Sequence, residues 1–234
     1  SDSKATPERH FQLAEGLLSR HYYQLAEEEF RSFLEKSPNH KLAPKALYRL
    51  TECLRGQSKY DEALEAISRF RSRWPDHKLT PKLLLAKAII QLQREEYKDA
   101  LGAFRVAAKS SDPAVRECAV FYMGRCFMLL GQRDAAKQMY ETLAGEALTK
   151  RHKYRPFAVA AVARLHQEDE AYEKANAAYR KLLKGGEAVP GKLREQALFN
   201  LGENMFYQEK HDDAIGYFEQ LLVDYPDSRY TARA

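Results

Sequence analysis

The chain has 234 residues, of which 44% are hydrophobic and 30% are charged, so it can form a continuous core and is too apolar for a disordered protein. Its 38 basic and 33 acidic residues give a net charge of +5. This mixed surface is unlike the concentrated basic face of a dedicated nucleic-acid-binding protein, and we expect no nucleic-acid partner. No apolar run reaches the roughly 18 residues that span a bilayer, and SDSKATPERH at the start holds no hydrophobic signal core.

A nine-residue pattern recurs at three places along the chain. It reads PNHKLAPKA from Pro38, PDHKLTPKL from Pro75 and PDSRYTARA from Pro226. A wider register is set by alanines spaced 36 to 39 residues apart, which we call the anchor alanines: Ala26, Ala63, Ala100, Ala136, Ala175 and Ala214. Six copies of a nearly constant period indicate a repeat architecture.

Each copy has the pattern of two packed helices. A small residue stands twelve positions before each anchor, at Ala14, Thr51, Ala88, Gly124, Ala163 and Gly202. A large residue stands four positions after each anchor, at Phe30, Ile67, Phe104, Tyr140, Tyr179 and Phe218. Small residues let two helices approach, and large ones fill the remaining space. We expect repeats over residues 7–40, 44–77, 81–114, 117–150, 156–189 and 194–228, with 229–234 beginning a further helix.

Prolines mark the ends of these helices. Three follow a second helix, and the other six fall at or just before the start of a first helix, where a missing N–H costs nothing: Pro7, Pro44, Pro81, Pro113, Pro156 and Pro190. Thr6, Thr80 and Asp112 precede three of these prolines and are candidate N-caps.

The series of small residue, turn tyrosine, alanine, aromatic and proline is clearest in FYMGRCFMLLGQRDAAKQMYETLA and LFNLGENMFYQEKHDDAIGYFEQLLVDYP. It resembles the tetratricopeptide repeat (TPR) over essentially the whole chain. The usual period is about 34 residues, and the longer period here is similar to that of bacterial cell-envelope proteins such as BamD and the TolA-binding protein.

The resemblance implies an all-α, right-handed superhelical TPR solenoid of about six helix-turn-helix repeats, in a single domain over residues 1–234. It implies a scaffold that binds a partner protein or peptide, with neither catalysis nor a cofactor. It favours a periplasmic or outer-membrane-associated location and leaves a cytoplasmic one open. The alternative function is a regulatory or substrate-recruiting arm of a larger multidomain protein or enzyme.

In this family the first helices line a concave groove, and the resemblance assigns to it the residues 15, 11 and 8 positions before each anchor. These spacings share one helix face. The groove would contain Phe11, Tyr48, Leu85, Phe121, Arg125, Met128, Arg164, Phe199 and Phe206. Aromatic and arginine side chains often dominate binding energy, and Arg125 with Arg164 suits a carboxylate. The alternative is that these groups pack against neighbouring first helices or against an N-terminal extension.

Few other motifs suggest chemistry. GEAVPGKL, from Gly186, matches a phosphate-binding loop, but Leu193 replaces the required Ser or Thr and a predicted helix precedes it, so we interpret it as a glycine stop and proline restart. No two histidines are spaced as metal ligands and there is no C-x-x-C, so no metal site is predicted. Cys118 and Cys126 would lie about 12 Å apart along one helix, too far for a disulfide.

A basic loop and the C-terminal segment also give expectations. The basic run KRHKYR, Lys150 to Arg155, is interpreted as a solvated loop, with an acidic peptide, lipid headgroups or nucleic acid as alternative ligands. The two earlier copies of the nine-residue pattern, PNHKLAPKA and PDHKLTPKL, each lead into a full helix. PDSRYTARA is the third copy, so we expect the native polypeptide to continue beyond Ala234. We also expect the face around Phe218, Leu221 and Leu222 to contact another molecule, either in a crystal or by weak self-association in solution.

Overall fold

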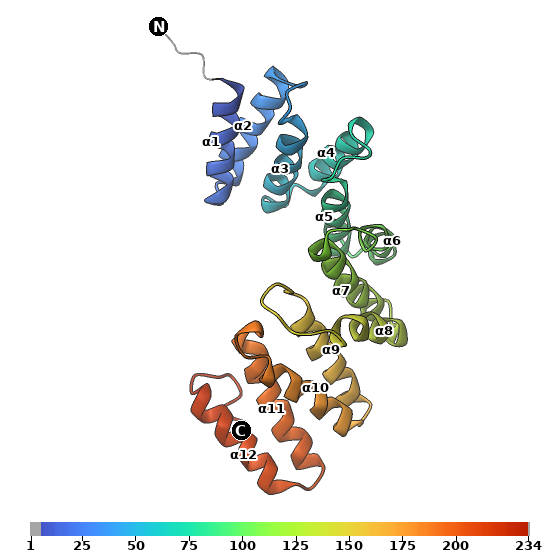
Figure 1. The fold of residues 1–234 in the computed structure, drawn as a ribbon, viewed down its shortest axis with the longest axis vertical. Helices are drawn as coiled ribbons and strands as arrows, with labels where there is room; N and C mark the ends of the chain where they lie inside the picture. Colours follow the sequence, from blue (N-terminus) through green and yellow to red (C-terminus); the bar gives the residue numbers. More distant parts are fainter. Residues whose placement is uncertain (1–5, 234) are drawn as a thin grey trace. The chain divides into compact units, whose positions relative to one another are not determined.

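The computed structural model describes residues 6–233, and these form twelve α-helices, one short 3₁₀ helix and no strand. The chain divides after Ser110 into two compact units. The first unit contains α1 (Pro7–Ser19), α2 (Tyr23–Lys36), α3 (Ala43–Gly56), α4 (Tyr60–Arg73), α5 (Thr80–Gln93) and α6 (Tyr97–Ala107) (Figure 1). The second contains α7 (Pro113–Leu129), α8 (Arg133–Ala144), α9 (Arg155–Glu168), α10 (Tyr172–Lys184), η1 (Gly186–Ala188), α11 (Gly191–Tyr207) and α12 (His211–Asp224).

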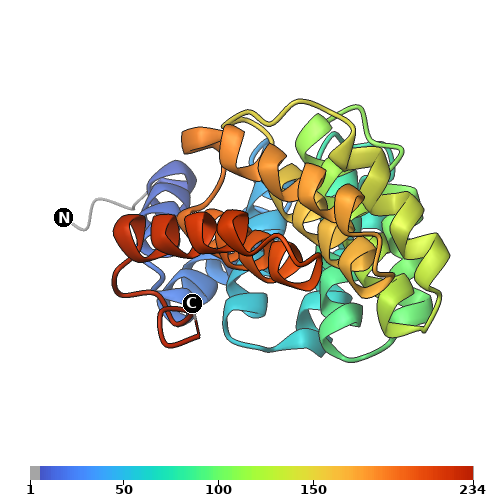
Figure 2. The same ribbon diagram turned by 90° about the horizontal axis from the view of Figure 1, so that it is seen from below.

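Each unit stacks three helix pairs, whose two members lie side by side in both views (Figures 1 and 2). The all-α class and the six helix-turn-helix repeats are confirmed. The prolines lie where the sequence predicts: six stand at the N-cap or in the first two positions of α1, α3, α5, α7, α9 and α11. Proline therefore sets where each first helix begins.

Close approach within a pair depends on the small residue of the first helix. A Cβ atom added to Gly124 would lie 2.6 Å from Cε1 of Tyr140, and one added to Gly202 would lie 2.4 Å from Cε1 of Phe218. Both separations are shorter than a van der Waals contact. All six anchor alanines are buried, and of the large residues that follow them only Phe218 is partly exposed. The predicted register of small and large side chains is therefore the packing register.

The turn inside every pair uses one residue in the left-handed conformation. In each turn this residue donates its N–H to the carbonyl three residues back, and the next N–H donates to the carbonyl five residues back at 2.8–3.0 Å. These two bonds form a Schellman motif, which satisfies the last carbonyls of the helix. The residues, with φ between 56° and 72°, are His21, Ser58, Glu95, Gly131, Glu170 and Glu209. Because five of the six are not glycine, the sequence did not predict this conformation.

The recurring nine-residue junctions are turns capped by their own third residue. The side chain of that residue accepts a hydrogen bond from the backbone N–H two positions later, at 3.1–3.2 Å. The capping residues are His40, His77 and Ser228. A histidine or serine at this position can accept such a bond, which explains why the motif tolerates both.

One of the three N-cap candidates is wrong. Asp112 caps α7, since its Oδ1 accepts a hydrogen bond from the N–H of Ala114 at 3.0 Å. Thr6 stands at the N-cap of α1 without a side-chain bond. Thr80 instead lies inside α5, and its hydroxyl donates to the carbonyl of Pro75 at 3.2 Å. The hydroxyl of Thr80 therefore bonds to the junction turn before α5 and does not cap the helix.

The C-terminal residues fold back on the last helix pair. Tyr230 stacks on Phe199 with ring centroids 4.5 Å apart, and residues 229–233 form successive turns where the sequence predicted the start of a helix. Ala234 lies outside the described residues. The stacking of Tyr230 on Phe199 places these turns against α11.

The outer face of α12 is partly covered by these C-terminal turns. Leu221 is buried in a cluster with Phe218, Tyr225 and Tyr230. Leu222 stays exposed. Contact of this face with another molecule, including a second copy of the chain, remains a prediction.

A buried carboxylate links α2 to the turn between α3 and α4. Glu27 is 6% exposed and accepts hydrogen bonds from Arg31 at 2.8 Å, Gln57 at 2.7 Å and Lys59 at 2.8 Å. Burial alone would raise the pKa of Glu27, but the bonds from Lys59, Arg31 and Gln57 outweigh it and hold the pKa below the usual value. The ionised form therefore stabilises the fold.

We expect Gly124→Leu to lower the free energy of unfolding by about 1–3 kcal/mol, through overpacking against Tyr140. The matched control is Gly102→Leu in α6, where an added Cβ meets no atom within 4 Å and the better helix former should be neutral or stabilising. Urea unfolding followed by circular dichroism compares the two. Equal stability of both variants would contradict the packing register.

We expect Gly131→Ala to lower the free energy of unfolding by about 1 kcal/mol, because an L-residue in the left-handed region costs about 1–2 kcal/mol. No atom lies within 4 Å of the added methyl, so only backbone strain is tested. Glu170→Gly at the equivalent turn position removes such strain and should not destabilise the protein. Urea unfolding of both variants measures the two changes in stability. If Gly131→Ala were more stable than the wild type, an L-residue would not be strained at this turn position.

Glu27→Gln should destabilise the protein by about 1–3 kcal/mol at neutral pH, because donors that served a carboxylate lose part of their bonding. A depressed pKa stabilises the fold above the unfolded-state value and loses this effect as pH falls through the folded-state value. The difference from the wild type should therefore be constant down to about pH 5 and shrink below about pH 4. Thermal melts of the wild type and the variant across this pH range measure the difference in stability. A difference that does not change with pH would show that the ionisation of Glu27 does not contribute.

Candidate functional site

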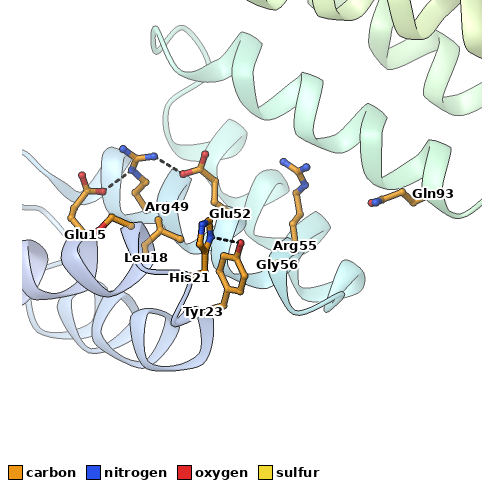
Figure 3. A pocket seen from close by; sticks show the side chains of 10 residues that line it. Glu15, Leu18, His21, Tyr23, Arg49, Glu52, Arg55, Gly56 and Gln93 are labelled. Atoms are coloured by element: carbon orange, nitrogen blue, oxygen red, sulfur yellow. Dashed lines mark hydrogen bonds and ion pairs between the residues drawn. The ribbon is translucent and has the colours of Figure 1, made fainter. Parts of the chain in front are cut away.

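The first helices of the pairs carry a hollow in each unit. The hollow of the first unit has a volume of about 500 Å³ and lies mainly between α1 and α3 (Figure 3). It is lined by Glu15, Leu18, Ser19, His21, Tyr23, Arg49, Glu52, Arg55, Gly56 and Gln93. Four of these residues, Glu15, Leu18, Glu52 and Arg55, occupy the positions that the TPR resemblance assigned to the groove.

Most charges in the first hollow are paired with one another. Arg49 lies between two carboxylates, with Nε 2.6 Å from Glu15 and Nη1 2.6 Å from Glu52 (Figure 3). Lys45 also reaches Glu15, at 2.9 Å. The hydroxyl of Tyr48 donates to Glu52 at 2.9 Å, and burial together with the charge of Glu52 raises the pKa of Tyr48 to about 12. This network holds α1 against α3 and leaves little net charge.

Arg55 is the exception in the first hollow. It forms no ion pair or side-chain hydrogen bond with another described residue, and its Nε is buried without a partner. The side chain of Gln93, from α5, lies across the hollow from it (Figure 3). A ligand with an acceptor group would satisfy Arg55 here.

The hollow of the second unit is smaller and of different chemistry. Its volume is about 370 Å³, and side chains of α7, α8, α9 and α11 surround it. It is lined by Phe121, Arg125, Met128, Leu129, Tyr140, Phe157, Ala160, Ala161, Arg164 and Gln196. Aromatic and aliphatic groups form its walls, and the only charged side chains in the lining are the two arginines.

Aromatic rings build one wall of the second hollow. The ring of Phe121 lies 5.7 Å from that of Tyr140 and 6.2 Å from that of Phe157. Phe157 is 41% exposed, although it belongs to an aromatic cluster. Burial raises the pKa of Tyr140 to about 12, so its hydroxyl stays protonated at neutral pH. An exposed aromatic wall of this kind can receive an apolar side chain.

The two arginines differ in how much they are engaged. The guanidinium of Arg125 lies over the ring of Tyr122, 5.5 Å from its centroid, and forms no ion pair within residues 6–233. Arg164 pairs with Glu168 at 3.4 Å, one turn later on α9, and both are largely exposed. An exposed pair of this length is weak, so both cations can bind a carboxylate.

The structure brings four of the nine predicted groove residues together. Phe121, Arg125, Met128 and Arg164 all line the second hollow. The sequence did not assign Phe157 to this site, although its place one turn before Ala160 on α9 puts it on the same helix face.

Two of the predicted groove residues belong instead to the core. Phe11 is 5% exposed and packs edge-on against Phe30 and Phe33, each with centroids 5.7 Å away. Phe199 is 3% exposed because Tyr230 covers it. Neither ring is available to a partner, which corrects the prediction for both.

The remaining three predicted residues lie outside the linings of both hollows. Tyr48 is half-buried and engaged with Glu52. Leu85 is half-buried on α5. Phe206 is exposed near the end of α11, beside Tyr207 and His211.

The basic run between α8 and α9 is bound to its own unit. Glu117, buried in α7, accepts hydrogen bonds from His152 at 2.7 Å and from the N–H of Tyr154 at 2.8 Å. Lys150 pairs with Glu187, and Arg155 pairs with Glu146. These pairs reduce the charge available to a ligand and favour a structural role for the loop.

The other motifs support no chemistry of their own. GEAVPGKL forms the turn η1 followed by Pro190 at the N-cap of α11, which confirms a helix stop and restart. The three cysteines are buried and none is in a disulfide; burial raises the pKa of Cys53 to about 12 and that of Cys126 to about 11. Within residues 6–233 no cluster of potential ligands could hold a metal ion, and no helix there is long and apolar enough to cross a membrane.

Comparisons with known proteins agree with this architecture. PilF of Pseudomonas aeruginosa is similar in structure with a TM-score of 0.70 and 18% identity over 97% of each chain. PilW, a widely conserved type IV pilus biogenesis factor, gives 0.66 and 18% over 95% of each chain. The C-terminal part of a TPR repeat-containing protein from Cytophaga hutchinsonii gives 0.70 and 19%, covering 91% of this chain and 78% of that one. At these identities the likeness shows the fold alone.

Sequence comparisons identify the family. No curated protein matches the chain. One family model, described as tetratricopeptide repeat, matches residues 11–78 and 54–115, and a second with the same description matches residues 119–146 and 196–228. The matches cover more than half of the chain and include helices of both units. The chain belongs to the tetratricopeptide repeat family.

Proposed function

We propose that the chain is a protein–protein interaction scaffold that binds a partner peptide through the hollow of its second unit, without catalysis of its own. The observation that carries the proposal is the composition of this hollow. Three aromatic rings and Met128 surround a space that also receives Arg125 and Arg164. Stacking of the helices does not require two arginines there.

The chemistry of the hollow indicates the chemistry of the partner. A volume of about 370 Å³ lies in the range of small-ligand pockets and suits one or two side chains of a peptide. An aromatic or large aliphatic side chain would pack against Phe121 and Phe157. A carboxylate beside it would pair with Arg125, the less engaged of the two arginines. We therefore expect a short acidic and aromatic segment.

The hollow of the first unit, taken by itself, offers a more polar surface. It already contains the paired charges of Arg49 with Glu15 and Glu52, so a partner gains little by competing for them. Among the described residues, Arg55 is the cation of this hollow that lacks a partner. A carbonyl or carboxylate group of a ligand suits this position.

We place this scaffold in a bacterial cell-envelope assembly, at the periplasm or the outer membrane. The long repeat period resembles that of cell-envelope TPR proteins, and PilW, one of the structurally similar proteins, is a type IV pilus biogenesis factor. These likenesses support the setting. Affinity capture from envelope and cytoplasmic fractions, each with the purified chain as bait, distinguishes this compartment from the cytoplasm.

The proposal is tested by panning a phage-displayed random peptide library on the purified chain. We expect enriched peptides to combine an aromatic or large aliphatic residue with Asp or Glu. Arg125→Glu with Arg164→Glu should weaken a selected peptide by about tenfold or more, because one charge-assisted hydrogen bond is worth about 1.5–3 kcal/mol. Fluorescence anisotropy of the labelled peptide measures this loss.

A matched control separates the hollow from the basic loop. Arg151→Glu with Lys153→Glu makes the same change in net charge within the same unit, at two exposed residues. It should leave peptide affinity unchanged. A loss in the loop variant with none in the hollow variant would assign binding to the loop and refute the proposal. Circular dichroism confirms that both variants are folded.

A further inference from the structure

A second kind of cleft lies between α4 and α5 in the first unit. Its volume is about 490 Å³, and Leu64 and Ile67 form its apolar part. The rest of the lining is polar: Ser68, Arg71 and Ser72 from α4, and Lys87 and Gln91 from α5. No carboxylate lines the cleft.

The five polar side chains of this cleft have no partners in the part of the chain that the structure describes. None forms a side-chain hydrogen bond or an ion pair with another residue among 6–233, whereas other basic side chains of the unit, such as Arg31 and Arg49, do. Gln91 is only 8% exposed, and its Oε1 is buried without a partner. A buried amide group without a bond is costly, so this arrangement calls for a ligand.

The equivalent positions are apolar at two of the three other places where helix pairs stack within a unit, and at the third, between α8 and α9, they hold Ala144, Val162 and His166. Arg71 stands eight positions after its anchor alanine, and Lys87 and Gln91 stand thirteen and nine positions before the next one. Between α2 and α3 these positions hold Leu34, Leu50 and Leu54, all buried. Between α10 and α11 they hold Leu183, Leu201 and Met205, which belong to the core or pack against it. Stacking therefore favours apolar residues where this cleft has two cations and an amide.

The surrounding helices reinforce the positive charge. The sequence of α5, TPKLLLAKAIIQLQ, contains no carboxylate. The carboxylates of α4 are confined to residues 61–65, near its start, and two of them are engaged: Asp61 with Arg94 and Glu62 with Arg31. An anion in the cleft would meet little repulsion from either helix.

We propose that this cleft binds a small phosphate monoester whose organic part is apolar. The phosphoryl group of such a ligand is largely a dianion at neutral pH and has three terminal oxygens that accept hydrogen bonds. Two cations and two serine hydroxyls match those oxygens, and the carboxamide of Gln91 can turn to present its Nε2 as a further donor. The organic part lies against Leu64 and Ile67.

Phosphate suits the site better than carboxylate does. A carboxylate has two oxygens and one charge, so it would leave one cation and some donors of the cleft unsatisfied. The competing explanation for Arg71 is that a cation near the C-terminus of α4 interacts with the helix dipole. That explanation accounts neither for Lys87, in the middle of α5, nor for Gln91.

Isothermal titration calorimetry of the full chain with phenyl phosphate tests the proposal. We expect saturable binding, weaker binding of inorganic phosphate, and weaker binding of benzoate. Arg71→Gln with Lys87→Met should reduce affinity for phenyl phosphate by on the order of tenfold or more, as expected for the loss of charge-assisted bonds. Arg69→Gln is the control for Arg71, because Arg69 is an exposed cation of α4 outside the lining; it should bind as the wild type does.

Several outcomes would overturn the proposal: no saturable binding at millimolar phenyl phosphate, benzoate binding as tightly as phenyl phosphate, or an unchanged affinity in the double variant. A second variant replaces Arg71, Lys87 and Gln91 with leucine, as between α2 and α3. It should melt at a higher temperature than the wild type and lose phenyl phosphate binding. If instead it were destabilised, the polar residues would serve the fold and the ligand site would be wrong. The peptide assay of the second unit is independent of all these results.

Discussion

The close contact between a small residue on the first helix and a large one on the second governs the rest of this structure. Where a glycine faces Tyr140 or Phe218, not even a methyl group fits between the helices. Elsewhere alanine or threonine serves the same purpose. Because this contact repeats with each anchor alanine, every pair closes in the same way. The turn between its helices then closes with the same two hydrogen bonds, whether or not a glycine is present.

This packing leaves other faces of the helices open to variation. In the first unit, the outward positions of α1 and α3 contain a network of paired charges, centred on Arg49, that holds the two helices together. In the second unit, equivalent positions contain Phe121, Arg125 and Arg164. One arrangement is largely satisfied within the chain, whereas the other exposes aromatic surface and incompletely paired cations. The same fold therefore supports different surface chemistry in each unit.

The cleft between α4 and α5 differs from the hollows because it lies where helix pairs stack. Apolar residues close the corresponding space between α2 and α3, with Leu34, Leu50 and Leu54 all buried. Polar groups without partners at such a place weaken the stack, so natural sequences retain them chiefly where they have another role. The cleft belongs to the first unit and the peptide hollow to the second, so the two sites can be tested separately.

Sequence alone determined the repeat register, the helix starts at proline and the pairing of small with large residues, because these depend on local spacing and on side-chain volume. It also placed Arg125 of α7 and Arg164 of α9 at the same repeat position, on the corresponding face of each helix. Tertiary structure decided which aromatic residues on that face are accessible: Phe199 is covered by Tyr230, whereas Phe121 borders a hollow. Spacing along a helix places a side chain on a face, but burial depends on what another segment brings against it, and periodicity within one helix cannot specify that contact.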